Sequence, residues 1–281
     1  MKKGLIFDIK EFAIFDGPGI RETVFFKGCP LRCAWCHNPE GLSHKVELSV
    51  AKASCIKCGK CRAVCNAEEC ILCGKCVEVC PLFLRKICGE EITSWELVER
   101  LLSHRDYYSA LGGGFTFSGG EPLMQHEFLF EVLEGLAGTH RVVETSAYAS
   151  AEVFSELLNR CEMVIMDIKL IDKQRHKIFI GVDNDRILGN YRLLVEKGLP
   201  HIIRMPIIPD VTDTAENMEG LVSLLKKDKS LEMLELLPYH VTAGAKYENV
   251  GRIYDPPFDV SKKITIHKEI LEKDNIRYRV L

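Results

Sequence analysis

The chain alternates between short apolar runs and longer segments with the period of an amphipathic helix. Apolar runs of four to eight residues, rich in β-branched side chains, predict strands, and apolar positions three and four residues apart predict helices. The expected strands lie at residues 23–26, 114–117, 141–144, 163–168, 201–207 and 231–237, after a β-like start at 4–15. The expected helices lie at residues 94–102, 128–136, 151–159, 185–196, 215–226 and 261–273. This alternation predicts an α/β fold of βα units, with six parallel strands where a closed barrel has eight.

Candidate polar residues follow five of the six expected strands. The fifth strand is the exception, because Arg204 lies inside it. The residues at the other strand ends are Cys29, Cys33, Cys36, Gly119, Gly120, Glu121, Glu144, Asp167, Lys169 and His240. Active sites of parallel α/β barrels lie at the carboxyl ends of the strands. We therefore expect these side chains to meet in one site.

Residues 42–91 interrupt the alternation, which divides the chain into a barrel part, residues 1–41 and 92–281, and a cysteine-rich insert. The two runs of the insert are Cys55, Cys58, Cys61 and Cys65, then Cys70, Cys73, Cys76 and Cys80. They resemble two-cluster bacterial ferredoxins, in which each run lends its last cysteine to the cluster of the other run. Only residues 66–69 separate the runs, and Asn66 stands where proline usually follows. One cluster, ligation within each run and a pair of zinc sites are the alternatives.

Composition narrows the class of protein. The 281 residues carry a formal net charge of −3, which gives no electrostatic reason to bind nucleic acid. No run approaches 18 apolar residues and the first residues do not form a signal peptide, so we expect neither a membrane span nor secretion. Eleven of the thirteen cysteines lie in tight runs, which ligate metal better than they form disulfides. We expect a monomer in the reducing cytoplasm of an anaerobic cell.

The two cysteines outside these runs are Cys88 and Cys161. Cys161 directly precedes an expected strand, so we expect a buried thiol there.

The run Cys29-x3-Cys33-x2-Cys36 predicts an iron–sulfur cluster with one open iron. A cluster that only carries electrons normally takes four cysteines, whereas three leave one iron without a protein ligand. An open metal position is a place for substrate, as it is in catalytic zinc sites. The alternative is a structural zinc site with His37 as the fourth ligand.

This cysteine spacing resembles the signature of the radical S-adenosylmethionine (radical SAM) enzymes. In that superfamily the open iron of a [4Fe–4S] cluster chelates SAM, and one electron splits a carbon–sulfur bond to release a 5′-deoxyadenosyl radical. Gly119-Gly120-Glu121 resembles the motif that holds the SAM amino group. The further cofactor contacts that the resemblance implies are Trp35, His37, Asn38, Glu144, Asp167, Lys169, Arg204 and His240.

Several of these residues also have structural interpretations. Asp167 and Lys169 lie two apart on a strand and so face one side; they fit either the SAM carboxylate and ribose or a structural ion pair. Asp167 and Glu144 together could gather a small monovalent cation. Arg204 could form a structural salt bridge. His240 could be a core histidine whose ring nitrogens have hydrogen-bond partners within the protein.

The turn Asp16-Gly17-Pro-Gly19-Ile-Arg21, followed by the cysteine run, resembles the activating enzymes of glycyl radical enzymes. The resemblance implies a partial (β/α)6 radical SAM barrel with an open mouth for a partner's glycine loop. Asp16, Gly17, Gly19 and Arg21 would contact that loop. The activase of pyruvate formate-lyase lacks the insert, so this chain resembles the subgroup that serves dehydratases, decarboxylases and C–N or C–S lyases. Two auxiliary [4Fe–4S] clusters would then relay electrons from a flavodoxin or ferredoxin.

The expected activity is reductive SAM cleavage followed by removal of a hydrogen atom from a backbone glycine of a partner enzyme. Two alternatives remain open at this point. One is another radical SAM enzyme with auxiliary clusters, such as a peptide-modifying enzyme. The other is an iron–sulfur electron carrier without catalysis.

Overall fold

Seven parallel strands form most of a nine-stranded sheet in the computed structural model, which describes residues 1–65 and 69–281. The strand order is β11-β10-β9-β8-β7-β6-β2-β1-β5. The parallel strands are β2 (Arg21–Phe26), β6 (Gly114–Gly119), β7 (Arg141–Thr145), β8 (Met163–Asp167), β9 (His201–Ile207), β10 (Leu231–Pro238) and β11 (Tyr278–Val280). The edge strands β11 and β5 do not pair with each other in the described residues, so the sheet is an open, partial barrel.

All six predicted parallel strands are confirmed, and β1 (Lys3–Ala13) is the predicted β-like start. β1 is antiparallel to both neighbours, β2 and the polar strand β5 (Glu90–Thr93). Neither β5 nor β11 was predicted. A strand of three or four residues, or one with charged residues at an edge, lacks the apolar run that marks a buried strand.

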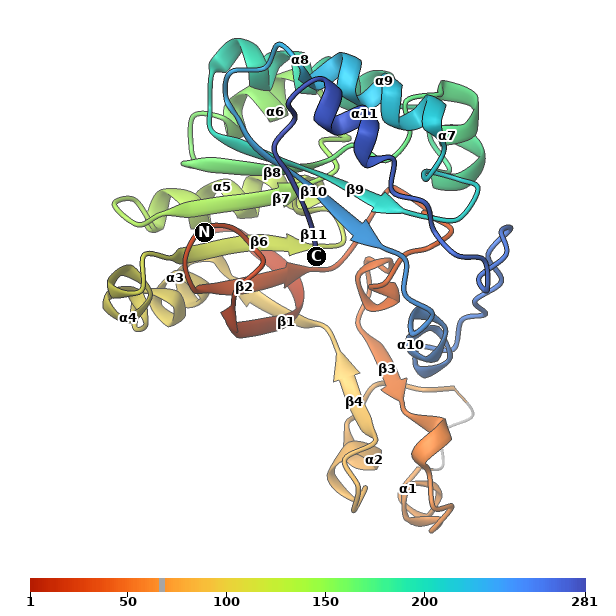
Figure 1. The fold of residues 1–281 in the computed structure, drawn as a ribbon. Coiled ribbons are helices and arrows are strands. Elements are labelled where there is room, and N and C mark those ends of the chain that lie inside the picture. The colour runs from red at the N-terminus through yellow and green to blue at the C-terminus, as the bar shows by residue number, and fades with distance from the viewer. Residues whose placement is uncertain (66–68) are drawn as a thin grey trace.

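The helices lie outside the sheet, and α6, α8, α9 and α11 run together along one face of it (Figure 1). The predicted helices are α3 (Ser94–Leu102), α5 (His126–Gly135), α6 (Ala151–Leu157), α8 (Asp185–Lys197), α9 (Ala215–Leu225) and α11 (Lys268–Lys273). The structure adds α4 (Arg105–Ala110), α7 (Lys173–Ile180), α10 (Ala243–Asn249) and a 3-10 turn, η3 (Pro122–Gln125). Apolar side chains between helices and sheet form the main core.

The last helix is shorter than predicted, because it begins at Lys268 rather than at residue 261. The β-branched residues Ile264, Thr265 and Ile266 disfavour a helix. The Thr265 amide instead donates to Asp213 Oδ2 at 3.0 Å, which holds this segment in a non-helical path.

The insert is a separate arm that extends away from the large sheet (Figure 1). Its stem is a two-stranded antiparallel sheet of β3 (Glu47–Val50) and β4 (Arg85–Cys88). Two four-residue helices, α1 (Lys60–Ala63) and α2 (Lys75–Glu78), lie at its far end. Short 3-10 turns η1 (Pro39–Gly41) and η2 (Lys52–Ser54) precede the two cysteine runs.

The chain returns to the large sheet at Glu90, two residues inside the predicted insert. The predicted departure from the ferredoxin pattern at Asn66 falls outside the described residues. No helix in the described part of the chain is long and apolar enough to cross a lipid bilayer.

Candidate active site

A pocket of about 530 Å³ lies at the carboxyl ends of the parallel strands. Its position follows from the topology, because parallel strands end at the same edge of the sheet. The structure brings fourteen of the predicted site residues to its wall: Asp16, Cys29, Cys33, Trp35, Cys36, His37, Asn38, Gly119, Gly120, Glu144, Asp167, Lys169, Arg204 and His240.

The three cysteines of the first motif share this pocket on a loop that follows β2. The amides of Arg32 and Ala34 donate to carbonyls at the end of α7, at 2.8 and 2.9 Å, so a neighbouring element fixes the loop. Burial raises the pKa of all three thiols, that of Cys33 to about 12. Ligation requires thiolates, so loading this site with metal releases protons.

The donor chemistry fits a cluster with one open iron, because three thiols face a cavity large enough for a small molecule. Within residues 1–65 and 69–281, no three His, Cys, Asp or Glu side chains converge on one point as the ligands of a single metal ion do. The fit of a cluster therefore rests on donor type and on the shared cavity. His37 lies on the same wall, and burial lowers its pKa, which favours a neutral ring.

Gly119 and Gly120 let two loops approach each other closely. A Cβ on Gly120 would lie 2.4 Å from the carbonyl oxygen of Gly28 and 2.5 Å from that of Gly41. Gly119 has a φ of +114°, a conformation that residues with a side chain rarely adopt. The Gly120 amide donates to Phe26 O at 2.8 Å. The glycines therefore serve the packing of this turn against the cysteine loop.

Glu121 does not line the pocket, contrary to the expectation that it reaches a bound ammonium group. It is 1% exposed, and its carboxylate accepts hydrogen bonds from the Leu123 amide, the Thr145 hydroxyl, and the amide and hydroxyl of Ser146. Burial raises the pKa of this carboxyl, and these bonds oppose the rise. Because Thr145 and Ser146 do line the pocket, Glu121 acts by holding its wall in place.

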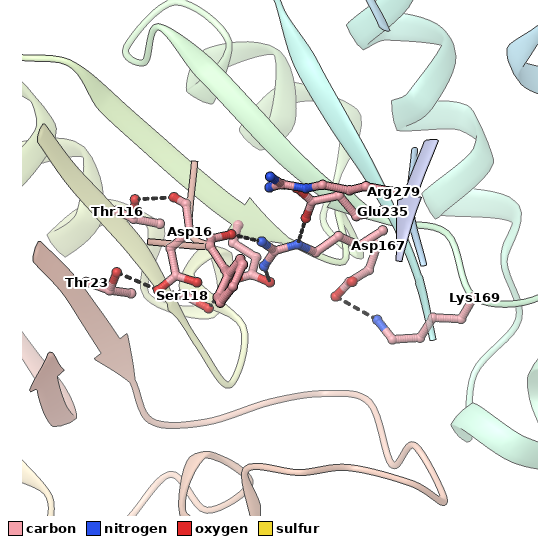
Figure 2. A network of polar contacts seen from close by, with 11 residues as sticks. Asp16, Thr23, Thr116, Ser118, Asp167, Lys169, Glu235 and Arg279 are labelled. Carbon is pink, nitrogen blue, oxygen red and sulfur yellow. Dashed lines mark hydrogen bonds and ion pairs between the residues drawn. The ribbon is translucent and has the colours of Figure 1, made fainter. Parts of the chain in front are cut away.

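Arg204 joins the buried carboxylate of Glu235 to the partly buried carboxylate of Glu144, which agrees with the salt-bridge alternative. Its Nε donates to Glu235 at 2.6 Å and a terminal nitrogen donates to Glu144 at 2.5 Å. Figure 2 shows this network, in which Arg279 also reaches Glu235. Burial alone would raise the pKa of Glu144, but Arg204 and a 2.6 Å hydrogen bond from Ser118 hold that pKa below its ordinary value.

Asp167 and Lys169 form an ion pair at the pocket wall, with a distance of 2.8 Å between carboxylate and ammonium (Figure 2). Burial alone would lower the pKa of Lys169, but Asp167 and the nearby cysteines outweigh it and raise that pKa. The side chains of both residues remain partly exposed to the pocket. Asp167 and Glu144 each have their own cationic partner, so a monovalent cation between them stays a prediction.

Asp16 lies where the glycine-rich turn meets the pocket. Its Oδ2 accepts a 2.7 Å hydrogen bond from Thr23, and its carbonyl accepts one of 2.7 Å from Thr116 (Figure 2). Burial and the negative charge of Glu144 raise the pKa of its carboxyl. The guanidinium of Arg204 donates a hydrogen bond to the carbonyl of Phe15, the residue before Asp16. This bond connects the turn to the ion pairs of Arg204 with Glu144 and Glu235.

Arg21, expected to contact a partner, is fully buried. Its guanidinium donates to the Thr116 hydroxyl at 2.6 Å and to the carbonyls of Phe115 and Pro18 at 2.7 and 3.0 Å. Burial lowers the pKa of Arg21 to about 10. Arg21 therefore stabilises the conformation of the turn through buried hydrogen bonds.

The glycines of the turn are equally constrained. Gly17 has a φ of +123°. Gly19 has a φ of +69°, and a Cβ there would lie 2.2 Å from the Gly112 carbonyl oxygen.

Sequence reasoning missed an aromatic group beside the cysteine loop. Tyr239 lines the pocket, and its hydroxyl lies 2.9 Å from that of Tyr254. Its ring packs edge-on against Phe258 and His37, with centroids 5.3 and 6.0 Å apart. Tyr254 and Phe258 come from an irregular segment without periodicity, so only the tertiary structure reveals them.

The eight cysteines of the insert fall into two groups that cross between the runs. A pocket of about 260 Å³ is lined by Cys55, Cys58 and Cys61 together with Cys80 of the second run. A smaller one is lined by Cys70, Cys73 and Cys76 together with Cys65 of the first run. Each pocket thus has three cysteines of one run and the last cysteine of the other, which is the predicted pairing.

Known proteins resemble the chain over nearly its full length. It is 37% identical over 275 residues to the choline trimethylamine-lyase activating enzyme of Oleidesulfovibrio alaskensis, covering 90% of this chain and 89% of that protein. It is 38% identical over 280 residues to the 4-hydroxyphenylacetate decarboxylase activating enzyme of Clostridium scatologenes, covering 90% and 88%. The pyruvate formate-lyase 2-activating enzyme of Escherichia coli is 32% identical, covering 98% and 91%.

The family model of a 4Fe-4S single cluster domain matches residues 15–188. Solved structures share the fold. QueE from Escherichia coli, 15% identical, superposes with a TM-score of 0.51 over 99% of this chain and 94% of its own. SuiB from Streptococcus suis, 12% identical, gives 0.56 over 90% of this chain and 46% of its own. Together with the cysteine motif and its pocket, the full-length relatives show that this chain is an enzyme of the radical SAM superfamily and belongs to the family of glycyl radical enzyme activating enzymes.

Proposed function

We propose that this enzyme cleaves SAM reductively to methionine and a 5′-deoxyadenosyl radical, which then removes a hydrogen atom from a backbone glycine of a partner glycyl radical enzyme. The observation that carries the proposal is the shared pocket, in which the three-cysteine loop faces Asp167, Lys169 and the Asp16 turn. The three relatives named above support the same activity, because each is named as an activating enzyme.

Cys29, Cys33 and Cys36 would hold a [4Fe–4S] cluster, which supplies one electron and an open coordination position when bound. Lys169, held as a cation by Asp167, would attract the SAM carboxylate. The apolar side chains on the pocket wall exclude water, which protects a carbon radical from side reactions. These side chains are Phe25, Leu31, Trp35, Ile208 and Leu237.

The partner's glycine segment would meet the chain at the Asp16 turn. This turn borders the pocket, and hydrogen bonds from Thr23, Thr116 and Arg204 hold it in one shape. A preformed turn loses little conformational entropy when an extended peptide binds to it. We assign direct peptide contact to Asp16 and the glycine backbone, with Arg21 as their support.

The chain would work as two units, the barrel of residues 1–41 and 92–281 and the insert of residues 42–91. The two cysteine groups of the insert support two auxiliary [4Fe–4S] clusters with crossed ligation. Such clusters would carry electrons from a flavodoxin or ferredoxin toward the pocket.

Electron paramagnetic resonance tests the function directly. Reduced protein, SAM and a candidate partner, mixed without oxygen, should give the glycyl radical doublet and release 5′-deoxyadenosine. Cys33→Ala should give neither product while keeping the iron of the insert. Redox cycling of the wild-type protein without any 5′-deoxyadenosine would refute the proposal in favour of an electron carrier. Radical formation on a different kind of residue would favour the peptide-modifying alternative.

A further inference from the structure

The first cysteine run of the insert carries an excess of positive charge. Residues 51–65 contain Lys52, Lys57, Lys60 and Arg62 and no Asp or Glu, although the whole chain has a net charge of −3. All four side chains are exposed. A cluster of one sign on a protruding arm creates a local field that attracts a partner of the opposite charge.

These charges surround one of the two cysteine pockets of the insert. Lys57, Lys60, Arg62 and Arg85 line the pocket formed by Cys55, Cys58, Cys61 and Cys80. No charged residue that the structure describes lines the pocket of Cys65, Cys70, Cys73 and Cys76. Arg85 also lies close to Cys76 of the second group, so the basic charge that marks one pocket and not the other is that of Lys57, Lys60 and Arg62.

Exposed apolar side chains lie in and next to this charged pocket. Ile56 and Leu82 line the charged pocket and are 64% and 44% exposed. The next residue, Phe83, is 88% exposed and has a φ of +52°, which is uncommon for a bulky side chain. An apolar centre with a charged rim is the usual anatomy of a protein–protein interface. We call Ile56, Leu82 and Phe83 with the four lining cations the basic tip.

The basic tip lies at the end of the arm that is farther from the barrel. Val50 pairs with Arg85 in the β3–β4 ladder, and both line the pocket of the basic tip. Leu48 pairs with Ile87 two residues away along the ladder, and both line the other pocket. At the rise of a strand, the pair that lines the charged pocket lies about 7 Å farther from the barrel than the pair that lines the other pocket. The order along the arm is the charged pocket, then the uncharged pocket, then the barrel.

The barrel end of the ladder touches the cysteine loop of the active site. Glu47, the first residue of β3, accepts a 3.1 Å hydrogen bond from the buried Lys27, and Lys27 is two residues before Cys29. Arg252 donates to the same carboxylate at 2.6 Å. The arm is thus fixed to the segment that carries the catalytic cysteines.

We propose that the basic tip is the docking surface for an acidic electron-carrier protein, and that electrons reach the chain there. This proposal rests on the proposed function. One electron leaves the reduced carrier and is taken up at the site of Cys55, Cys58, Cys61 and Cys80; no covalent bond forms or breaks. The uncharged pocket then lies between that site and the active-site pocket.

The test compares charge reversals at equivalent positions of the two runs. Lys60 and Lys75 are the first residues of α1 and α2, and each follows a glycine with positive φ. Lys75 is exposed but does not line the charged pocket, so Lys75→Glu is the matched control for Lys60→Glu. A double variant adds Lys57→Glu to Lys60→Glu to enlarge the effect. The probe is a bacterial flavodoxin with an acidic surface, and its dissociation constant for the full-length, cluster-loaded protein is measured without oxygen. A ferredoxin serves as a second probe of the same chemistry.

The double variant should bind flavodoxin at least about tenfold more weakly, and Lys75→Glu should change binding by less than about twofold. Wild-type affinity should fall as salt rises from about 50 to 500 mM, because salt screens exposed charges. Equal losses in both variants, salt-independent binding, or no binding to the wild type would overturn the proposal. SAM cleavage with dithionite bypasses the carrier, so its absence in the wild type would instead show that the proposed function fails.

Discussion

At the scale of single residues, the site depends on pairing charges that are taken out of water. Arg204 lies between Glu144 and Glu235, and all three side chains are largely buried. Removing one partner of such a group costs about 3–5 kcal/mol, because it leaves uncompensated buried charge. The same group supports the carbonyl of Phe15 at the edge of the turn.

Replacement of this arginine should make stability depend on pH in a new way. In the wild type the pKa of Glu144 lies below its ordinary value of 4.5, so this carboxylate stabilises the fold above that pH and the contribution is lost only as pH falls through the lower value. In Arg204→Met, burial without the arginine raises that pKa, so the variant should gain stability as pH falls from 8 to 6. Anaerobic urea unfolding at both pH values, with the wild type as control, measures the difference. A pH-independent loss would mean that Arg204 acts through packing alone.

Asp167 offers a test of binding at the same scale. Asp167→Ala removes the carboxylate that is expected to contact SAM beside Lys169, and should weaken SAM binding about tenfold or more, since a hydrogen bond to a charged group contributes about 1.5–3 kcal/mol. Calorimetry with SAM measures the affinity, and Asp167→Asn separates charge from shape. Unchanged affinity in the alanine variant would leave Asp167 with a structural role only.

At the scale of elements, the strands bring the predicted residues together. The cysteines, Asp167 and His240 could be predicted as neighbours, because polar residues at the ends of parallel strands share one edge. The burial of Arg21 and Glu121 could not be predicted. Their positions depend on hydrogen bonds to residues such as Thr116 and Thr145 on other strands, which no local pattern encodes.

The short elements escaped prediction for a related reason. β3, β4, β5 and β11 have three or four residues each, too few to show a period. Their pairing comes from long-range contacts, such as those of β5 with β1.

Two glycines should respond oppositely to the same substitution. Gly120→Ala places a methyl group against the carbonyls of Gly28 and Gly41, so it should shift the cysteine loop, lower stability and weaken SAM binding. Gly189 lies inside α8 with nothing near the added methyl, so Gly189→Ala should stabilise the protein by about 0.5–1 kcal/mol. Urea unfolding and calorimetry of both variants test the pair. Normal SAM affinity in Gly120→Ala would show that the close approach is not needed for the site.

At the scale of the whole molecule, three cysteine groups lie along one path from the arm to the barrel. If each holds a cubane cluster, the loaded protein carries about twelve irons per chain. Cys80→Ala should disturb the cluster of Cys55, Cys58 and Cys61, and should spare that of the second run. Iron and sulfide analysis with spectroscopy of each cluster measures this. Loss of the second-run cluster in Cys80→Ala would establish ligation within runs, and about eight irons in the wild type would mean a single insert cluster.

The two ends of the arm lie side by side, because Glu47 pairs with Cys88 at the base of its ladder. Because these ends already meet, a short turn could join them at little loop-closure cost and leave the strand order of the barrel unchanged. The buried Lys27 would then lose the carboxylate of Glu47 and need a new partner. The barrel keeps its own cysteine motif on the other side of that junction. Exchange of the arm as a unit therefore requires a compensating change at Lys27, and under the proposed function it would alter which electron carrier docks while the barrel keeps its cysteine motif.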